Sequence, residues 1–176
     1  MLVVLLPSAV AVGIYLFGTH HTPRYSNGLF GEHGNAAVDL KAQLSTALLG
    51  FAIIQLGLAL WMYGRVPGTR SAPRPVRRGH RALGFLSFLF SLPIAYHCLT
   101  TYGIETMSPR ATIHSFAGCA LYGAFVAKLI VVRSRRLPGW LLPAAGALLV
   151  LGVALLWYTA ALWALNGDSA PGFSSV

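Results

Sequence analysis

Residues 79–128 read GHRALGFLSFLFSLPIAYHCLTTYGIETMSPRATIHSFAGCALYGAFVAK, and this stretch decides the fold. It consists of two apolar segments, each long enough to cross a membrane, joined by a short polar connection. Three histidines, His80, His97 and His114, lie inside these segments. An ionisable side chain at bilayer depth costs on the order of 3 kcal/mol, so it needs a partner or a bound group that offsets its burial. The stretch therefore predicts a transmembrane helical hairpin whose histidines have a function.

The composition of the whole chain indicates the same class. Of its 176 residues, 56% are hydrophobic and only 10% are charged, and the mean hydropathy is +0.65. Such a chain has too little polar surface to coat a soluble globule, so we expect an integral membrane protein. The two cysteines, Cys98 and Cys119, lie in apolar runs, which argues against a disulfide framework and against a thiolate metal site.

Five apolar stretches are near the roughly 20 residues that a membrane-spanning helix needs. They cover approximately residues 2–18, 40–63, 80–102, 110–132 and 140–165. The first has no basic residue ahead of it and no evident cleavage site, so we interpret it as an uncleaved helix rather than a signal peptide. We expect an all-α integral membrane protein, a five-helix transmembrane bundle formed by a single membrane domain over residues 1–176.

The distribution of charge predicts the orientation of this bundle. Arginines crowd the second and fourth connections and are Arg65, Arg70, Arg74, Arg77, Arg78, Arg81, Arg133, Arg135 and Arg136. The four acids, Glu32, Asp39, Glu105 and Asp168, belong to the opposite side. By the positive-inside rule, the N-terminus is cytoplasmic and the C-terminus lies outside. The net charge of +9 then reflects membrane topology in a bacterial plasma membrane, with the lipid bilayer as partner and no nucleic acid.

The depth of the histidines decides which of them can meet. At 1.5 Å per residue, His97 and His114 both lie within roughly 8 Å of the outer ends of their helices. Two level imidazoles on facing helices are the axial ligands that a low-spin b-type haem requires. We therefore predict that His97 and His114 bind haem iron, with Gly118 leaving room for the porphyrin edge one turn from His114. The alternatives are hydrogen bonds of these histidines to each other or to backbone carbonyls, or a proton path.

A second level, near the inner surface, contains His80, Gly84 and Lys128. Lys128 lies about 21 Å deeper than His114, close to where His80 begins its helix. A second haem could use His80 with Gly84 beside it, but its partner would have to be Lys128 or an open coordination site. The alternatives are a head-group contact for His80 and, for Lys128, snorkelling or pairing with a propionate or lipid phosphate.

Two further polar features need interpretation. In the connection GTHHTPRYSNGLFGEHGN, His20, His21 and His33, with Glu32, could gather copper or zinc, although the spacing is not a recognised signature. A solvated polar loop or a contact with an extracytoplasmic redox partner is the alternative, and we expect Leu29 and Phe30 to dip into the lipid. In the second span, Gln55 is expected to bond a neighbouring helix or, alternatively, a quinone carbonyl.

The motifs HRALG, LPIAYHC, IHSFAGC, YGAFVAK, LPGW and TAALW together resemble an uncharacterised family of small five-helix actinobacterial membrane proteins, over about residues 40–163. More distantly, the histidine-bearing helices resemble cytochrome b561 and ferric-reductase-like haem b membrane proteins. Those proteins carry electrons across membranes between quinols, ascorbate or flavin and an outside acceptor. They use four histidines as two pairs, whereas this chain offers one level pair and His80. The resemblance implies haem b, one or two per chain, and a quinone as a further cofactor.

We therefore expect a membrane-bound b-type cytochrome, an electron-transfer subunit that relays electrons between quinone or quinol and an extracytoplasmic or complex-bound redox partner. It would be an oxidoreductase component with no catalytic domain of its own, because the connections are too short to form one. The alternative is a haem-free structural or assembly subunit of a respiratory membrane complex. A small transporter is a third hypothesis, which the lack of broken helices and paired repeats disfavours.

Overall fold

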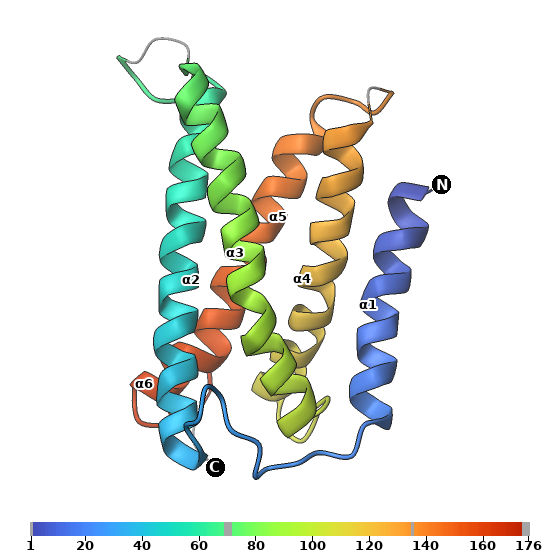
Figure 1. Ribbon diagram of the computed structural model, residues 1–176, viewed down its shortest axis with the longest axis vertical. Coiled ribbons are helices and arrows are strands. Elements are labelled where there is room, and N and C mark those ends of the chain that lie inside the picture. The colour runs from blue at the N-terminus through green and yellow to red at the C-terminus, as the bar shows by residue number, and fades with distance from the viewer. Residues whose placement is uncertain (1, 69–71, 135, 174–176) are drawn as a thin grey trace.

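A computed structural model of the protein describes residues 2–68, 72–134 and 136–173 and contains five long helices (Figure 1). All five are long and apolar enough to cross a membrane. The first four are α1 (Leu2–His20), α2 (Gly34–Met62), α3 (Arg74–Thr101) and α4 (Pro109–Arg133). The fifth span consists of α5 (Leu141–Leu156), the π-helix η1 (Trp157–Ala161) and α6 (Leu162–Leu165). The predicted all-α architecture with five candidate membrane spans is thereby confirmed.

Two of the helices begin well before their apolar stretches. α2 begins at Gly34 and α3 at Arg74, each about two turns ahead of the predicted start. Proline stands at the first turn of α3, where its missing N–H costs nothing because that turn has no intrahelical acceptor. Hydropathy marks where a helix enters lipid, whereas hydrogen bonding continues into the polar connection. The first turns of α3 therefore carry arginines outside the apolar stretch.

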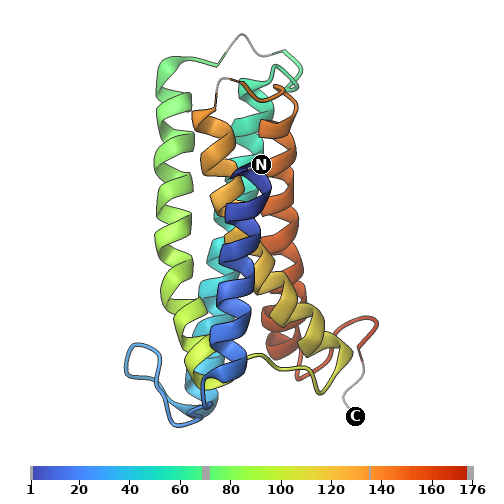
Figure 2. The ribbon, with the colours of Figure 1, turned by 90° about the vertical axis from the view of Figure 1, so that its right-hand side faces the viewer.

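The helices do not pack in the order in which they follow one another along the chain. α1 packs against α4, α4 against α5, α5 against α2, and α2 against α3. Figure 1 shows α2 beside α3 and α1 beside α4, and in Figure 2 α1 lies in front of α4. Among the described residues, α3 and α4 have no extended backbone contact, although they are consecutive. The predicted hairpin is therefore two helices held apart, with side chains between them.

Aromatic and hydroxyl side chains bridge the space between α3 and α4. The ring of Phe88 lies 5.2 Å, centroid to centroid, from that of Phe125. The hydroxyl groups of Ser91 and Tyr122 lie 3.0 Å apart. The buried core lies beside this bridge, where α2, α4 and α5 meet, and contains Leu48, Ala52, Leu121, Ala124, Leu149 and Val153.

Small residues bring α1 close to α4. A Cβ atom on Gly123 would lie 2.7 Å from the carbonyl oxygen of Pro7 and 3.3 Å from Cβ of Ala11. The first distance is too short for any side chain without movement of the α1 backbone. Small residues of this kind let membrane helices approach closely, where packing contacts provide most of the attraction.

The two ends of the bundle differ in charge. One end contains the α2–α3 and α4–α5 connections, and the other contains the α1–α2 and α3–α4 connections and the C-terminal segment (Figure 1). The described arginines at or near the first end are Arg65, Arg74, Arg77, Arg78, Arg81, Arg133 and Arg136, whereas Arg70 and Arg135 lie outside the described residues. Glu32, Asp39, Glu105 and Asp168 belong to the second end. We call these the basic end and the acidic end.

Candidate functional site

A pocket at the acidic end, here called the outer pocket, lies between the α1–α2 connection and the last turns of α3. Its volume is about 380 Å³, within the range of about 300–1,000 Å³ typical of small-molecule sites. It is lined by His21, Arg24, Asn27, Gly28, Leu29, Phe30, Pro93, Tyr96, His97 and Thr100. The α1–α2 connection thus folds over the last turns of α3 and lines a pocket together with them.

The connection is fixed in place by its own backbone and by α3. The backbone N–H of Arg24 donates to the carbonyl of Thr100 at 3.1 Å, and Leu29 and Glu32 exchange two backbone hydrogen bonds of 2.9 and 3.0 Å. Between Leu29 and Glu32 the chain turns through Phe30 and Gly31, both at positive φ. Leu29 is only 4% exposed whereas Phe30 is 72% exposed. The expectation that both side chains dip into the lipid is therefore wrong for Leu29, which is buried and lines the outer pocket.

His97 is buried in this pocket with one ring nitrogen paired and the other free. Its side chain is 3% exposed, and Nε2 lies 3.2 Å from the carbonyl oxygen of Asn27. Because a carbonyl oxygen only accepts, Nε2 bears the proton, and the neutral ring keeps its lone pair on Nδ1. Nδ1 is buried and has no hydrogen-bond partner among the described residues. Such an atom costs about 1–3 kcal/mol if nothing binds it.

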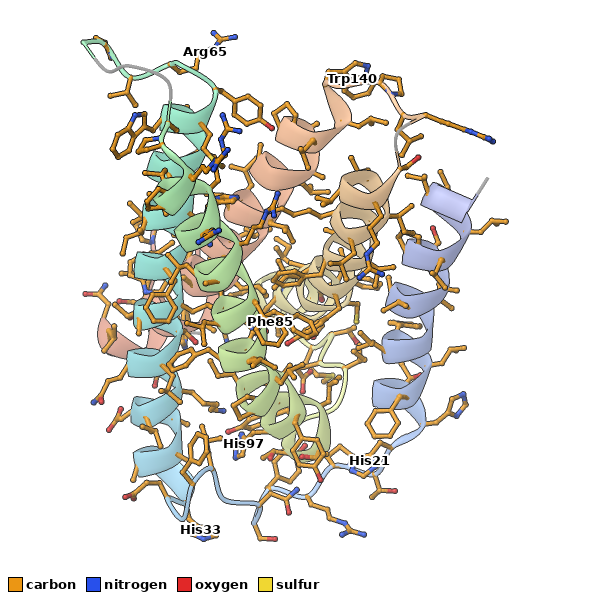
Figure 3. All side chains as sticks on the ribbon, turned by 45° about the horizontal axis from the view of Figure 1, so that its top comes forward. His21, His33, Arg65, Phe85, His97 and Trp140 are labelled. Atoms are coloured by element: carbon orange, nitrogen blue, oxygen red, sulfur yellow. The ribbon has the colours of Figure 1, made fainter. Side chains whose placement is uncertain are left out.

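His21, the residue that follows α1, lines the same pocket. Its ring stacks on Phe17 with 5.3 Å between the ring centroids, and its Nε2 is buried without a partner in the part of the chain that the structure describes. Figure 3 shows His21 and His97 at the same end of the bundle, opposite Arg65 and Trp140. The pocket therefore contains two imidazoles, each with a buried ring nitrogen that no described residue hydrogen-bonds.

His114 lies in a different cavity, which we call the inter-helix cavity. This cavity has a volume of about 120 Å³ and lies between α3, α4 and the fifth span, with one residue from α1 and two from α2. Nδ1 of His114 lies 2.9 Å from Oγ1 of Thr159, which is fully buried in η1. Gly118, Cys98 and Cys119 also line the cavity. The structure thus separates the two predicted haem ligands, because His97 faces the outer pocket and His114 the inter-helix cavity.

The π-helix explains how Thr159 comes to meet α4. A π-helix adds a residue to the turn and often occurs at functional positions. Arg110, one turn before His114 on α4, donates through Nη1 to the carbonyl of Thr159 at 2.6 Å. The guanidinium also lies 4.3 Å from the ring centroid of Trp163. Arg110 and His114 therefore hold the backbone and the side chain of the same residue.

The inner level joins His80 to α2 rather than to a second histidine. Nε2 of Gln55 donates to the carbonyl of His80 at 2.7 Å, which confirms the expected helix contact. A Cβ on Gly84 would lie 3.3 Å from that amide nitrogen, so glycine makes room for Gln55. Nδ1 of His80 and Oε1 of Gln55 are buried without partners among the described residues. Lys128 lies within electrostatic range of His80.

The outer-loop histidines do not gather into a metal site. Nδ1 of His33 lies 3.1 Å from the carbonyl of Ser26, His21 stacks on Phe17, and His20 is exposed. Nowhere in the described residues do three or more His, Cys, Asp or Glu side chains form a group that could hold a metal ion. This arrangement offers no support for the copper or zinc site.

Sequence reasoning missed three residues of these sites, namely His21 as a neighbour of His97, Asn27 as its acceptor, and Thr159. Asn27 accepts from His97 through its backbone carbonyl, and a sequence gives no signal for such a contact. Thr159 did have a signal, because it is the polar residue in the otherwise apolar and aromatic run LLWYTAALW. A buried hydroxyl in such a run needs a partner, and a histidine on another helix is a suitable one.

No curated protein and no solved structure matches the chain. One family model does match, and it covers residues 1–172, which is nearly the whole sequence. Over that range the chain belongs to DUF6529, a family of unknown function.

Proposed function

We propose that this protein is a b-type cytochrome of the bacterial plasma membrane, an electron-transfer subunit with its haem at the acidic, extracytoplasmic end. The observation that supports it best is the unpaired Nδ1 of His97, a side chain only 3% exposed that lines a pocket of ligand size. A neutral imidazole with one N–H bonded to a carbonyl and a free lone pair on the other nitrogen is typical of a metal-ligating histidine.

Two imidazoles line the outer pocket, and imidazole is a common ligand of haem iron. His97 and His21 would hold the iron, since each has a buried ring nitrogen without a partner among the described residues. Either ring nitrogen of histidine can ligate a metal. Arg24 lines the pocket as a cation that could neutralise a propionate. When bound, haem would supply a one-electron redox centre.

Of the two predicted ligands, this proposal retains His97 and replaces His114 with His21. The reason is geometric, because His97 and His21 line one pocket whereas His114 lines another. The loop over the pocket contributes the buried Leu29 and the carbonyl of Asn27. These residues limit water access to His97 and fix the tautomer of its ring. A second haem at His80 has no support beyond the unpaired Nδ1 of that residue.

The distribution of charge suggests how the bundle is oriented in the membrane, and the position of the outer pocket suggests its redox partners. The arginines of the basic end favour a cytoplasmic position by the positive-inside rule, so the N-terminus would be cytoplasmic and the C-terminus outside. A pocket at the acidic end would then meet an extracytoplasmic redox protein or a partner subunit. Quinol in the bilayer is the natural electron donor for a haem in this position.

An absorption spectrum tests the proposal. Protein purified in detergent from haem-replete cells should show a reduced-minus-oxidised haem b difference on adding dithionite. His97→Ala and His21→Ala should each lose most of the pigment. His20→Ala is the matched control, because His20 is adjacent but exposed, and this variant should keep the spectrum. A colourless wild-type protein would overturn the proposal.

A second candidate, a haem-free structural or assembly subunit of a respiratory complex, has its own supporting observation. His97 and His114 each hydrogen-bond another part of the chain, at Asn27 and Thr159 respectively. Such bonds between segments are what a purely structural histidine would make. This candidate predicts a colourless protein that co-purifies with a larger complex, and near-normal assembly of that complex when His114 is replaced by glutamine.

A further inference from the structure

The inter-helix cavity is close to, and somewhat smaller than, a cavity known to hold a single aromatic ring. Its volume is about 120 Å³, whereas an engineered apolar cavity of about 150 Å³ is known to hold benzene. Most of its lining is apolar, including Ile14, Leu48, Ile94, Leu99, Leu121, Val153 and Leu156. A flat ring from the bilayer is therefore a suitable occupant by size and by polarity.

The cavity offers a hydrogen-bond acceptor at His114. The hydroxyl of Thr159 donates to the carbonyl of Leu155 at 2.7 Å, so its single proton is already used. Thr159 must then accept from His114, which places the imidazole proton on Nδ1. In the neutral ring, Nε2 keeps its lone pair and is the nitrogen that His114 can present to a ligand.

Four hydroxyl or indole donors that line the cavity already donate hydrogen bonds to other protein groups. Ser91 donates to the carbonyl of Phe88 at 2.7 Å, and the hydroxyl of Tyr122 donates to the carbonyl of Ser91 at 3.2 Å. The hydroxyl of Ser115 donates to the carbonyl of Glu105 at 3.0 Å, and the indole N–H of Trp157 donates to Thr46 at 2.9 Å. A ligand that only accepts hydrogen bonds therefore finds few partners, and a ligand that donates finds His114.

We infer that the inter-helix cavity binds the ring of a lipid-soluble hydroquinone, with a ring hydroxyl donating to Nε2 of His114. This site is separate from the outer pocket and from the proposed haem. The quinone form of the same ring lacks the hydroxyl proton, so the site favours the reduced form. Gly118 lies beside His114 and leaves part of the cavity open, because a Cβ there would meet nothing closer than Leu156 at 3.9 Å.

Binding of hydroquinone itself, kept reduced under anaerobic conditions, tests the inference on the full chain in detergent. Saturation-transfer NMR or calorimetry should give saturable binding to the wild type. His114→Phe removes the acceptor while keeping a ring, and its Kd should rise about tenfold. Gly118→Leu should fill the cavity and abolish binding. Gly146→Leu is the matched control, because a Cβ at Gly146 meets nothing within 4 Å, and it should bind like the wild type.

The outcomes separate this inference from the proposed function. Absence of saturable binding to the wild type, or an unchanged Kd in both His114→Phe and Gly118→Leu, overturns the inference. Circular dichroism of each variant shows whether it is folded, and Gly118→Leu tests the cavity without touching His114. The dithionite spectrum of the same samples reports on haem alone. Binding without pigment would overturn only the proposed cytochrome, and pigment without binding only the hydroquinone site.

Discussion

Nδ1 of His114 lies 2.9 Å from Oγ1 of Thr159, and this contact determines which nitrogen of the imidazole is free. Thr159 can serve as the acceptor because it is completely buried and its own proton goes to Leu155. The contact also joins α4 to the one π-helical segment recorded among the described residues. One hydrogen bond therefore contributes both to the packing of the bundle and to the chemistry of the inter-helix cavity.

Thr159→Val should destabilise the protein, because valine keeps the shape of threonine but leaves the N–H of His114 buried without an acceptor. The expected loss in the free energy of unfolding is about 1–3 kcal/mol. Thermal unfolding in detergent measures it. Thr159→Ser keeps the hydroxyl and should retain most of the stability. Equal midpoints for Thr159→Val and the wild type would show that the contact contributes nothing.

Gly123→Val should separate α1 from α4. The new Cβ would lie 2.7 Å from the carbonyl oxygen of Pro7, so one of the two backbones must move. Overpacking of this kind costs about 1–3 kcal/mol, and the midpoint of thermal unfolding in detergent should fall. Gly146→Val is the control, since nothing lies within 4 Å of a Cβ there. If both variants unfold at the same temperature, α1 is not packed on α4 as described.

Gly28→Ala should loosen the loop over the outer pocket. The added Cβ would lie 2.6 Å from Cε1 of His33, so the imidazole must leave its place beside the carbonyl of Ser26. Trypsin should then cleave after Arg24 several times faster than in the wild type, as measured by gel electrophoresis. Ser26→Ala is the control, because only the backbone of Ser26 takes part in the contact, and its cleavage rate should not change.

Cysteine labelling in intact cells tests the proposed orientation. With Cys98 and Cys119 replaced by alanine, a cysteine at Ser26 should react with a membrane-impermeant maleimide added outside, because Ser26 is exposed at the acidic end. A cysteine at Arg65, exposed at the basic end, should react only after the membrane is opened. The reverse pattern would place the arginines outside, contrary to the positive-inside rule.

The number of spans could be predicted from the sequence because lipid imposes it. Every backbone polar group in the hydrocarbon must be paired, and a run of about 20 apolar residues is the simplest solution. The starts of the helices were harder to predict, because α2 and α3 begin in polar sequence at Gly34 and Arg74. At those positions proline and loop geometry decide the boundary rather than hydropathy.

Only one feature of the candidate sites, the depth of each histidine, could be predicted from the sequence. Counting residues gives the depth of a histidine along its helix, but it does not give the direction of the side chain around the helix axis. His97 and His114 are predicted at one level, yet they face different cavities. Their direction depends on which helices are neighbours. That order was not encoded in any local pattern, because α3 packs on α2 and α4 packs on α1.

The pairing of α1 with α4 has a consequence for biosynthesis. α1 leaves the ribosome before α4, and its packing partner α4 emerges only after α2 and α3 have been made. Until then α1 must reside in the bilayer alone, and its sequence suits this, because it contains no Asp, Glu, Lys or Arg and its apolar window has a mean hydropathy of 1.7. α1 would therefore pack into the bundle only after α4 has been made.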